Sequence, residues 1–221
     1  MSALQVVYED NHCLAVLKPA GLLTVGDRTG DESLVDRVRD YLRVKYKKPG
    51  NVFVGVVHRL DRPVGGVVLF ARTSKAASRL AEQFRSGRVE KVYQAVVEGR
   101  VAVREGLLVD RLVKNRQTNV VRRDRDGDPR ARESQLSFRR LRSTSTSTLL
   151  EIRPMTGRSH QIRVQLAAAG HPIVGDRKYG SMRALDDGIA LRAVSLTFEH
   201  PTSKLRITVE APADWRLSSA T

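Results

Sequence analysis

Between residue 107 and about residue 155 the chain carries a series of short strand-like runs separated by polar segments. The runs are LLVDRLV, NVVRR, SQLSFRRL and TLLEIRP. Short runs rich in β-branched residues between turn signals are typical of strands. Similar runs lie near both ends of the chain, and only a few segments have helical spacing. We therefore predict an α+β fold with several antiparallel pairs.

Strands are also expected in the flanking segments. QVVYED and CLAVLKP would pair around a turn at Asp10-Asn11, and KVYQAVVEG would form another strand. IALRAVSLTFE and KLRITVEAP would close the chain around a turn at His200-Pro201. The segment STSTST at 143–148 is predicted to be a hairpin turn with adjoining strand edge.

Helical spacing predicts three helices. The first would follow Thr29 to Glu32, which has the spacing of a capping box, and the second would have Ser74 as its N-cap and would stop at Gly87. The third would be capped by Ser159 and would end at Gly170. Because there is no internal repeat and no long linker, we expect a single domain over residues 1–221.

The charge of the chain indicates a polyanionic partner. There are 39 Lys and Arg residues against 24 Asp and Glu, a net charge of +15, and residues 111–142 alone hold 11 basic against 4 acidic side chains. Such an excess favours nucleic acid. The alternative is a basic protein whose charges are merely solvated, because charge alone specifies neither a sequence nor a reaction.

Compartment follows from what the sequence lacks. Cys13 is the only cysteine, so an intrachain disulfide and a thiolate metal cluster are excluded. MSALQVVYEDN has no basic segment followed by an apolar one, as a leader peptide would, and no apolar run approaches the roughly 20 residues of a membrane span. We expect a soluble protein of the cytoplasm.

The stretch GVVHRLDRPVGGVVLFAR, residues 55–72, places Asp61 between Arg59 and Arg62 in what reads as strand, turn and strand. A carboxylate at a buried strand end is costly unless cations and hydrogen bonds compensate it, and the arginines favour its ionised form. Two readings stay open: a buried ion pair that fixes a turn, and a nucleophile or general base.

Three further segments carry candidate residues with two readings each. In PMTGRSHQIRVQLAAAGHP, Arg158 and Arg163 lie near a helix start that could receive a phosphate or face Asp61, or they could be solvated surface arginines. His160 could be structural or catalytic. Tyr93 of KVYQ could be a core residue or a functional one, and Lys18 of KPAGLLTV a cleft wall or a ligand contact.

Metal and nucleotide cofactors are disfavoured by the sequence. Asp124, Asp126 and Asp128 alternate, but the glycine comes too early for a calcium loop, and the Asp-Gly pair is predicted to be a hairpin turn. The five histidines show no ligand spacing, and there is no phosphate-binding glycine loop. We therefore expect neither a metal nor another cofactor.

Five segments combine into one pattern. They are KPAGLLTV, HRLDRPVGGVVLFA, EKVYQAVVEG, TGRSHQIRVQLAAAGHPIVGDRKYG and IALRAVSLTFEHP. The pattern resembles the RluA family of pseudouridine synthases, from about residue 5 to residue 212, and HRLD with TGRxHQIR in this order is highly specific. The resemblance implies a pseudouridine synthase fold: a mixed, largely antiparallel central sheet, with flanking helices and loops around a basic cleft.

The resemblance also implies roles. Asp61 would be the catalytic aspartate, Tyr93 would pack on the target base, and Arg163 would pair with Asp61. Arg59 would hold the flipped nucleotide or fill its vacated place, and Arg158 would act in a conformational change or bind phosphate. The positions expected to contact RNA are Arg59, Arg62, Arg158, His58 and Lys18. Where relatives often have a hydroxyl residue before the glycine and two histidines, this chain has Val64, Gln165 and Arg192.

The implied reaction breaks the N1–C1′ bond of a uridine, turns the base and rejoins it through C5. Nothing is added or lost, so no cofactor is needed. The expected partner is structured RNA, ribosomal or transfer, and the nucleotide must be extruded to be reached. Many relatives carry an S4-type domain, which is not expected here, so the catalytic domain would hold RNA itself. We expect a monomer without membrane contact.

Two other classes stay open at this point. The first is a catalytically silent RNA-binding factor, which would bind RNA without forming the isomer. The second is a hydrolase of nucleic acid, which would depend on a metal or would release free uracil.

Overall fold

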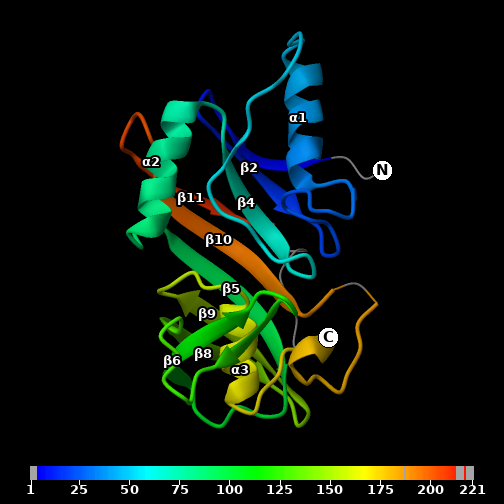
Figure 1. Ribbon diagram of the computed structural model, residues 1–221, viewed down its shortest axis with the longest axis vertical. Helices are drawn as coiled ribbons and strands as arrows, with labels where there is room; N and C mark the ends of the chain where they lie inside the picture. Colours follow the sequence, from blue (N-terminus) through cyan, green and yellow to red (C-terminus); the bar gives the residue numbers. More distant parts are fainter. Residues whose placement is uncertain (1–3, 187, 213–216, 218–221) are drawn as a thin grey trace. The chain divides into compact units, whose positions relative to one another are not determined.

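The computed structural model describes residues 4–186, 188–212 and 217, so Met1, Ser2 and Ala3, with which the segment examined for a leader peptide begins, lie outside the described residues. The chain forms two compact units, drawn in Figure 1. Unit 1 comprises the described residues up to 90 and those from 193 to 212, and unit 2 comprises those from 91 to 192 together with 217. The expectation of a single domain over 1–221 stays a prediction.

Unit 1 combines two helices with a sheet. Its strands follow the order β1-β2-β4-β10, with β11 on β10 and β3 on β4. The pairs β1–β2, β2–β4, β3–β4 and β10–β11 are antiparallel. The elements are β1 (Gln5–Glu9), β2 (Cys13–Lys18), α1 (Leu34–Lys45), β3 (Gly55–Val56), β4 (Gly65–Ala71), α2 (Ser74–Arg85), β10 (Leu191–Glu199, in unit 1 from Ala193 on) and β11 (Arg206–Glu210).

Unit 2 contains an antiparallel sheet in the order β5-β9-β8-β6-β7. Leu112, Val121 and Val164 form a small core between this sheet and helix α3, with Tyr179 packed against it. The elements are β5 (Glu90–Glu98), β6 (Glu105–Asn115), β7 (Val120–Arg123), β8 (Arg132–Ser143), β9 (Ser147–Pro154), α3 (Gln161–Ala168) and the short 3-10 helix η1 (Arg177–Tyr179). The α+β class predicted from the sequence is confirmed.

Alternation along the strands builds the core of unit 1. Successive side chains of a strand point to opposite faces, and the odd-numbered residues of β2 and β4 share one face. That face packs against Ala76 and Leu80 of α2 and against β10 and β11. Cys13 belongs to this core and is fully buried. Burial, with a smaller contribution from nearby Asp10, raises the pKa of its thiol to about 12.

The N-cap residues predicted for the first two helices are wrong. Ser33 caps α1 and forms a reciprocal capping box with Asp36, so the box lies downstream of Thr29. Thr73 caps α2 by accepting the backbone N–H of Ala76 at 3.2 Å, one residue before the expected Ser74.

The third helix begins differently from the prediction. His160 precedes α3 in the left-handed conformation at φ 51°, and Ser159 does not cap it. The side chain of Gln161 organises this turn, because its Oε1 accepts the backbone N–H of Arg158 at 3.0 Å. At 161–168 the helix ends just before the expected Gly170.

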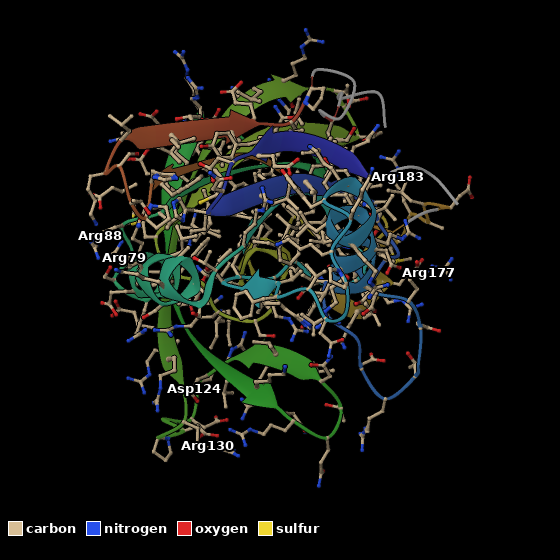
Figure 2. The ribbon with its side chains drawn as sticks, turned by 90° about the horizontal axis from the view of Figure 1, so that it is seen from above. Arg79, Arg88, Asp124, Arg130, Arg177 and Arg183 are labelled. Atoms are coloured by element: carbon tan, nitrogen blue, oxygen red, sulfur yellow. The ribbon has the colours of Figure 1, made fainter. Side chains whose placement is uncertain are left out.

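The predicted strands and most of their turns are confirmed. The STSTST segment closes the β8–β9 hairpin, in which the Thr144 N–H donates to Ser147 O at 2.8 Å. The Asp-Gly pair does not form a hairpin turn: the loop between β7 and β8, labelled at Asp124 and Arg130 in Figure 2, joins two strands that both pair with β6.

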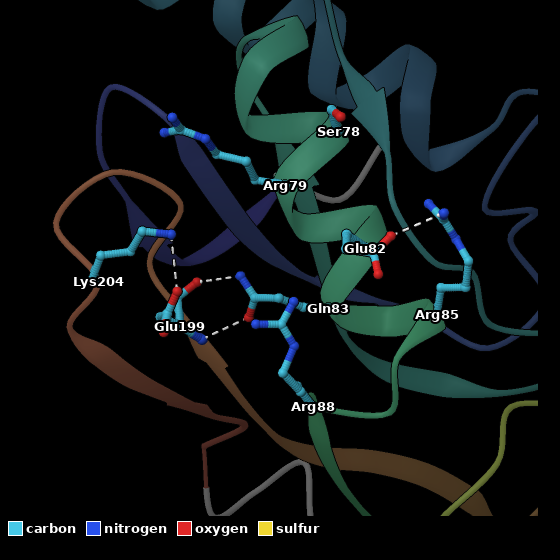
Figure 3. A pocket seen from close by; sticks show the side chains of 8 residues that line it. All are labelled: Ser78, Arg79, Glu82, Gln83, Arg85, Arg88, Glu199 and Lys204. Carbon is cyan, nitrogen blue, oxygen red and sulfur yellow. Dashed lines mark hydrogen bonds and ion pairs between the residues drawn. The ribbon is translucent and has the colours of Figure 1, made fainter.

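The end of β10 is attached to α2 by one side chain. Gln83 is 3% exposed; its Nε2 donates to Glu199 O at 2.8 Å and its Oε1 accepts the Glu199 N–H at 2.9 Å. Figure 3 shows both bonds as dashed lines. Gln83 and Glu199 also help to line a pocket of about 380 Å³. The lining residues are Ser78, Arg79, Glu82, Gln83, Arg85, Arg88, Glu199 and Lys204.

A Gln83→Leu variant is expected to lower the free energy of unfolding by about 2 kcal/mol, because it leaves a donor and an acceptor of Glu199 without these partners. Denaturant titration measures the loss. Glu82→Gln serves as control: its ion pair with Arg85 is exposed, so its change should stay within about 0.5 kcal/mol. Equal losses in the two variants would contradict the assignment.

Candidate functional site

Asp61 lies in the loop that connects β3 with β4 in unit 1. The loop is held down by Leu60 and Val64, which are buried, while Arg59 and Arg62 are exposed and Asp61 is half-buried. The apolar residues on either side of the aspartate therefore fix the loop to the unit. The carboxylate is carried on a short, packed turn between two elements of the sheet.

Hydrogen bonds fix the peptides on both sides of Asp61. Thr24 Oγ1 donates to Leu60 O at 2.8 Å and accepts the Leu60 N–H at 3.2 Å. The Gly21 N–H donates to Arg62 O at 2.9 Å, and the Val64 N–H donates to Asp61 O at 3.0 Å. Every one of these bonds uses the backbone of the loop. These backbone bonds fix the loop on both sides of the aspartate.

Lys18 takes a different place from the RNA contact expected for it. Its side chain is fully buried, and its Nζ donates to three backbone carbonyls, of Pro19, Leu22 and Arg62, at 3.0, 2.6 and 3.1 Å. A buried ammonium group with three carbonyl acceptors joins the KPAGLLTV segment to the Asp61 loop. The residue is a support of the loop and is too buried to form a phosphate contact.

A Lys18→Met variant is expected to lower the free energy of unfolding by about 3 kcal/mol, since it leaves three partly buried carbonyl acceptors without the ammonium donor. Thermal or denaturant unfolding measures this loss. Lys75→Met, at an exposed position of α2, is the matched control and should change stability by less than about 0.5 kcal/mol. A Lys18 variant as stable as its control would show that the carbonyls are satisfied otherwise.

Arg62 follows Asp61 directly in the sequence, but its side chain bonds to other residues. Its Nε donates to Gly21 O at 3.0 Å, and its Nη1 pairs with Asp31 at 2.9 Å. Both members of that ion pair are about half exposed. The Arg62 side chain therefore links the Asp61 loop to Gly21 and Asp31 at the surface of unit 1. Its charge stays exposed and can also attract an anion.

His58 anchors the start of the same loop. Its Nε2 accepts the backbone N–H of Leu69 in β4 at 2.9 Å. The imidazole also stacks on Phe84 of α2, with 4.5 Å between ring centroids and 16° between ring planes. The side chain expected to contact RNA is thus engaged inside unit 1.

In unit 2, Arg163 forms a buried bidentate ion pair with Asp176. Its Nε and Nη2 donate to the two carboxylate oxygens at 2.7 and 2.8 Å, and the side chains are 5% and 1% exposed. The guanidinium also lies over the ring of Tyr179, 5.0 Å from its centroid. Asp176 thus takes the Nε and Nη2 edge of the guanidinium. The predicted pairing of Arg163 with Asp61 stays a prediction.

Arg158 lies on a loop that is tied to β8. Thr156 Oγ1 donates to Gln161 Oε1 at 2.7 Å, and Gln161 Nε2 donates to Gln135 O at 3.0 Å. The Arg158 side chain is exposed, and its Nε donates to Glu133 O at 3.2 Å. An exposed guanidinium on a braced loop is suited to phosphate binding.

Tyr93 lies in β5, opposite Ile152 of β9, and is half-buried. Lys91, two residues earlier, points to the same side of the strand. Its Nζ donates to Thr156 O at 3.3 Å, and burial lowers its pKa from the ordinary value. The sequence did not single out Lys91, although it precedes Tyr93 in the KVYQ segment.

His160 has a structural partner in unit 2. Its Nδ1 lies 2.6 Å from the hydroxyl of Tyr179, which also accepts the Val121 N–H at 3.1 Å. Of the two readings of His160, the structure supports the structural one. Tyr179 and Asp176 were both missed, although they lie in the GDRKYG end of a quoted motif, because the sequence does not show that they converge on Arg163.

Within the described residues, one group has ligand atoms close enough together for a metal ion: Asp10, Cys13 and His200. Its atoms already take part in hydrogen bonds, because the Asp10 carboxylate accepts from Tyr8 Oη at 2.6 Å, from His200 Nε2 at 2.8 Å and from two backbone N–H groups. The raised pKa of the thiol also disfavours a thiolate ligand. We assign the group to holding together the turn between β1 and β2 and the turn between β10 and β11.

Basic side chains project from both units. Figure 2 labels Arg79 and Arg88 of unit 1 and Arg130, Arg177 and Arg183 of unit 2. The pocket of Figure 3 is not the expected basic cleft, because it lies on α2 and its lining includes two glutamates. In the described ranges, no helix combines the length and the apolar character that crossing a bilayer requires.

Comparison with known proteins gives one consistent result. The sequence model described as RNA pseudouridylate synthase matches residues 12–168. The chain is 36% identical over 220 residues to the dual-specificity RNA pseudouridine synthase RluA of Escherichia coli K12, covering 96% of this chain and 94% of that protein. It is 33% identical over 222 residues to ribosomal large subunit pseudouridine synthase C of Vibrio cholerae, covering 97% and 67%.

Solved structures give the same fold. The human RNA pseudouridylate synthase domain containing 4 superposes with a TM-score of 0.79 at 21% identity, over 96% of this chain and 90% of that one. The human domain containing 1 superposes with a TM-score of 0.75 at 24% identity, over 95% and 83%. At these identities the likeness concerns the fold alone.

Proposed function

Because this chain belongs to the RNA pseudouridylate synthase family, we propose that it isomerises specific uridines of ribosomal or transfer RNA to pseudouridine, with Asp61 as the catalytic aspartate. One observation carries the assignment. The backbone on both sides of Asp61 is fixed by Thr24, Gly21 and Val64, while the carboxylate stays half-buried on the loop. A positioned carboxylate is what this reaction needs from the protein.

The carboxylate would attack C1′ or C6, or take the 2′ proton, as the N1–C1′ bond breaks. The base then turns and rejoins the ribose through C5, and a proton is lost from C5 and gained at N1. All atoms of the uridine are kept. The reaction needs no redox change, so the proposal includes no cofactor and no metal.

Unit 2 would supply the other catalytic side chains. We assign Tyr93 to packing on the target base, and Arg163 to holding the charge of the Asp61 carboxylate. The rigid pairing of Arg163 with Asp176 supports this role, since a guanidinium fixed at one edge is pre-oriented for a second anion.

RNA would be held by exposed arginines. Arg59, Arg62 and Arg158 are exposed, and residues 111–142 add a large basic excess. These charges would contact phosphates in a basic cleft, while the target nucleotide is extruded from a loop of structured RNA. Lys18 and His58 would support the catalytic loop and would not contact RNA.

We further propose that the protein works as a monomer in the cytoplasm, with residues 1–221 acting as one catalytic domain. One relative is named a dual-specificity RNA pseudouridine synthase and another is named for the ribosomal large subunit, which supports ribosomal RNA as the first substrate to test.

The test is formation of pseudouridine by the purified chain. Ribosomal and transfer RNA from a strain that lacks the gene are incubated with the protein, and carbodiimide adduct stops are mapped by primer extension. New stops at specific uridines are the expected result. RNA binding without new stops would indicate a silent RNA-binding factor. Release of free uracil, or loss of activity to a chelator, would indicate a hydrolase.

A further inference from the structure

The edge of β4 that faces away from β2 has three partners in succession. Ala71 and Phe70 pair with Gly55 and Val56 of β3. At the other end of β4, Gly66 comes so close to β10 that a Cβ atom on it would lie 2.1 Å from Ala193 O. Between these two contacts lies Leu69, which is fully buried, so its backbone N–H needs an acceptor.

The regular partner for Leu69 would be Val57. The register of β3 on β4 pairs residue 55 with 71 and 56 with 70, so the next pair in an antiparallel ladder would be 57 with 69. The strand β3 ends at Val56 instead, and the Leu69 N–H donates to Nε2 of His58 at 2.9 Å. The imidazole thus replaces a backbone carbonyl in the ladder.

This replacement lets the main chain leave the sheet. The Val57 carbonyl no longer has to face β4, so the chain can leave the sheet at His58, three residues before Asp61. The Leu69 N–H keeps an acceptor, because it bonds to the imidazole. The next anchor, Thr24 on Leu60, follows two residues after His58. Phe84 fixes the plane of the imidazole by stacking on it, so the ring cannot swing away from Leu69.

We propose that His58 is a positioning residue, which sets the exit angle of the Asp61 loop by acting, as a neutral imidazole, in place of a main-chain acceptor. Since Nε2 accepts a hydrogen bond, the neutral ring carries its proton on Nδ1. The inference rests on the proposed function, because its consequence for catalysis requires Asp61 to be the catalytic group. Its structural part, the tautomer, does not depend on any activity.

Two substitutions separate the acceptor from the stacking. His58→Phe keeps an aromatic ring against Phe84 and removes the acceptor. His58→Gln places an oxygen near the position of Nε2 and removes the ring. If the acceptor positions the loop, single-turnover rates should fall about 100-fold in the Phe variant, the effect of a misplacement of about 1 Å, and about threefold in the Gln variant. RNA dissociation constants should stay within about threefold in both, because the loss concerns geometry and not RNA contacts.

The order of the two variants decides the proposal. A Phe variant that turns over as fast as the Gln variant, or a loss of RNA affinity that matches the loss of rate, would overturn it. If the Phe variant does not fold, nitrogen NMR of the ¹⁵N-histidine-labelled parent chain decides: protonated Nδ1 with unprotonated Nε2 at His58 supports the proposal, and the opposite tautomer overturns it. A parent chain that forms no pseudouridine but shows the Nδ1 tautomer refutes the proposed function alone.

Discussion

An Asp61→Asn variant is expected to form no detectable pseudouridine, a loss of at least about 10³-fold, while its melting temperature and RNA affinity stay near those of the parent. The anchors of the loop are backbone groups of Leu60, Asp61 and Arg62, so the amide should leave the loop where it is. An amide of the same size cannot act as nucleophile or base. Primer-extension mapping measures the product, and filter binding measures RNA affinity.

The matched control is Asp31→Asn. Asp31 also lies in unit 1 and pairs with the neighbouring Arg62 at 2.9 Å, but this pair is exposed, so the same change of charge should cost less than about threefold in rate. Turnover by the Asp61 variant at more than about 1% of the parent rate would remove the catalytic assignment. An equal loss in both variants would instead point to a general charge effect.

The second large effect concerns the ion pair of Arg163 with Asp176. Arg163→Met is expected to lower the free energy of unfolding by about 3–5 kcal/mol, since it leaves Asp176 as a buried charge without its bidentate partner. Asp176→Leu should cost a similar amount for the converse reason. Denaturant unfolding measures both losses, and pseudouridine formation should fall in each variant.

The double variant Arg163→Met/Asp176→Leu separates structure from catalysis. With both charges gone, much of the stability should return, because a buried pair replaced by apolar side chains is often neutral for stability. Activity should not return, since the guanidinium assigned to Asp61 is still missing. If the double variant regains activity along with stability, Arg163 is only a structural partner of Asp176 and its catalytic assignment is wrong.

The strands could be predicted from the sequence because their signals are local. Runs such as TLLEIRP alternate or stay apolar over the length of one strand, and turn residues mark their ends. Helix starts were less well predicted, since several hydroxyl and acidic residues compete for the cap. At α1, Ser33 and not Thr29 is the cap, because Ser33 forms a capping box with Asp36. At α3 no hydroxyl group caps the helix: His160 is left-handed, and the Gln161 side chain accepts the Arg158 N–H.

Motifs single out Asp61, Tyr93 and Arg163 as candidate site residues, but the residues that support them could not be predicted. Asp176 lies 13 residues after Arg163, and Arg62 lies 44 residues after Lys18. Such pairs depend on how the chain folds back on itself, which no local pattern records. The contacts of Lys18 and His58 inside unit 1 could not be foreseen for the same reason: a basic side chain in a motif can support the loop from inside as well as meet the ligand.

The burial of Cys13 has a practical consequence. It is the chain's only thiol, lies fully inside unit 1 and resists ionisation because burial raises its pKa to about 12. A maleimide or disulfide reagent can reach it only during transient opening of that unit. Cys13 can therefore report on local opening of unit 1 without any added label. The rate at which the native protein is alkylated measures how often the core around β2 becomes accessible.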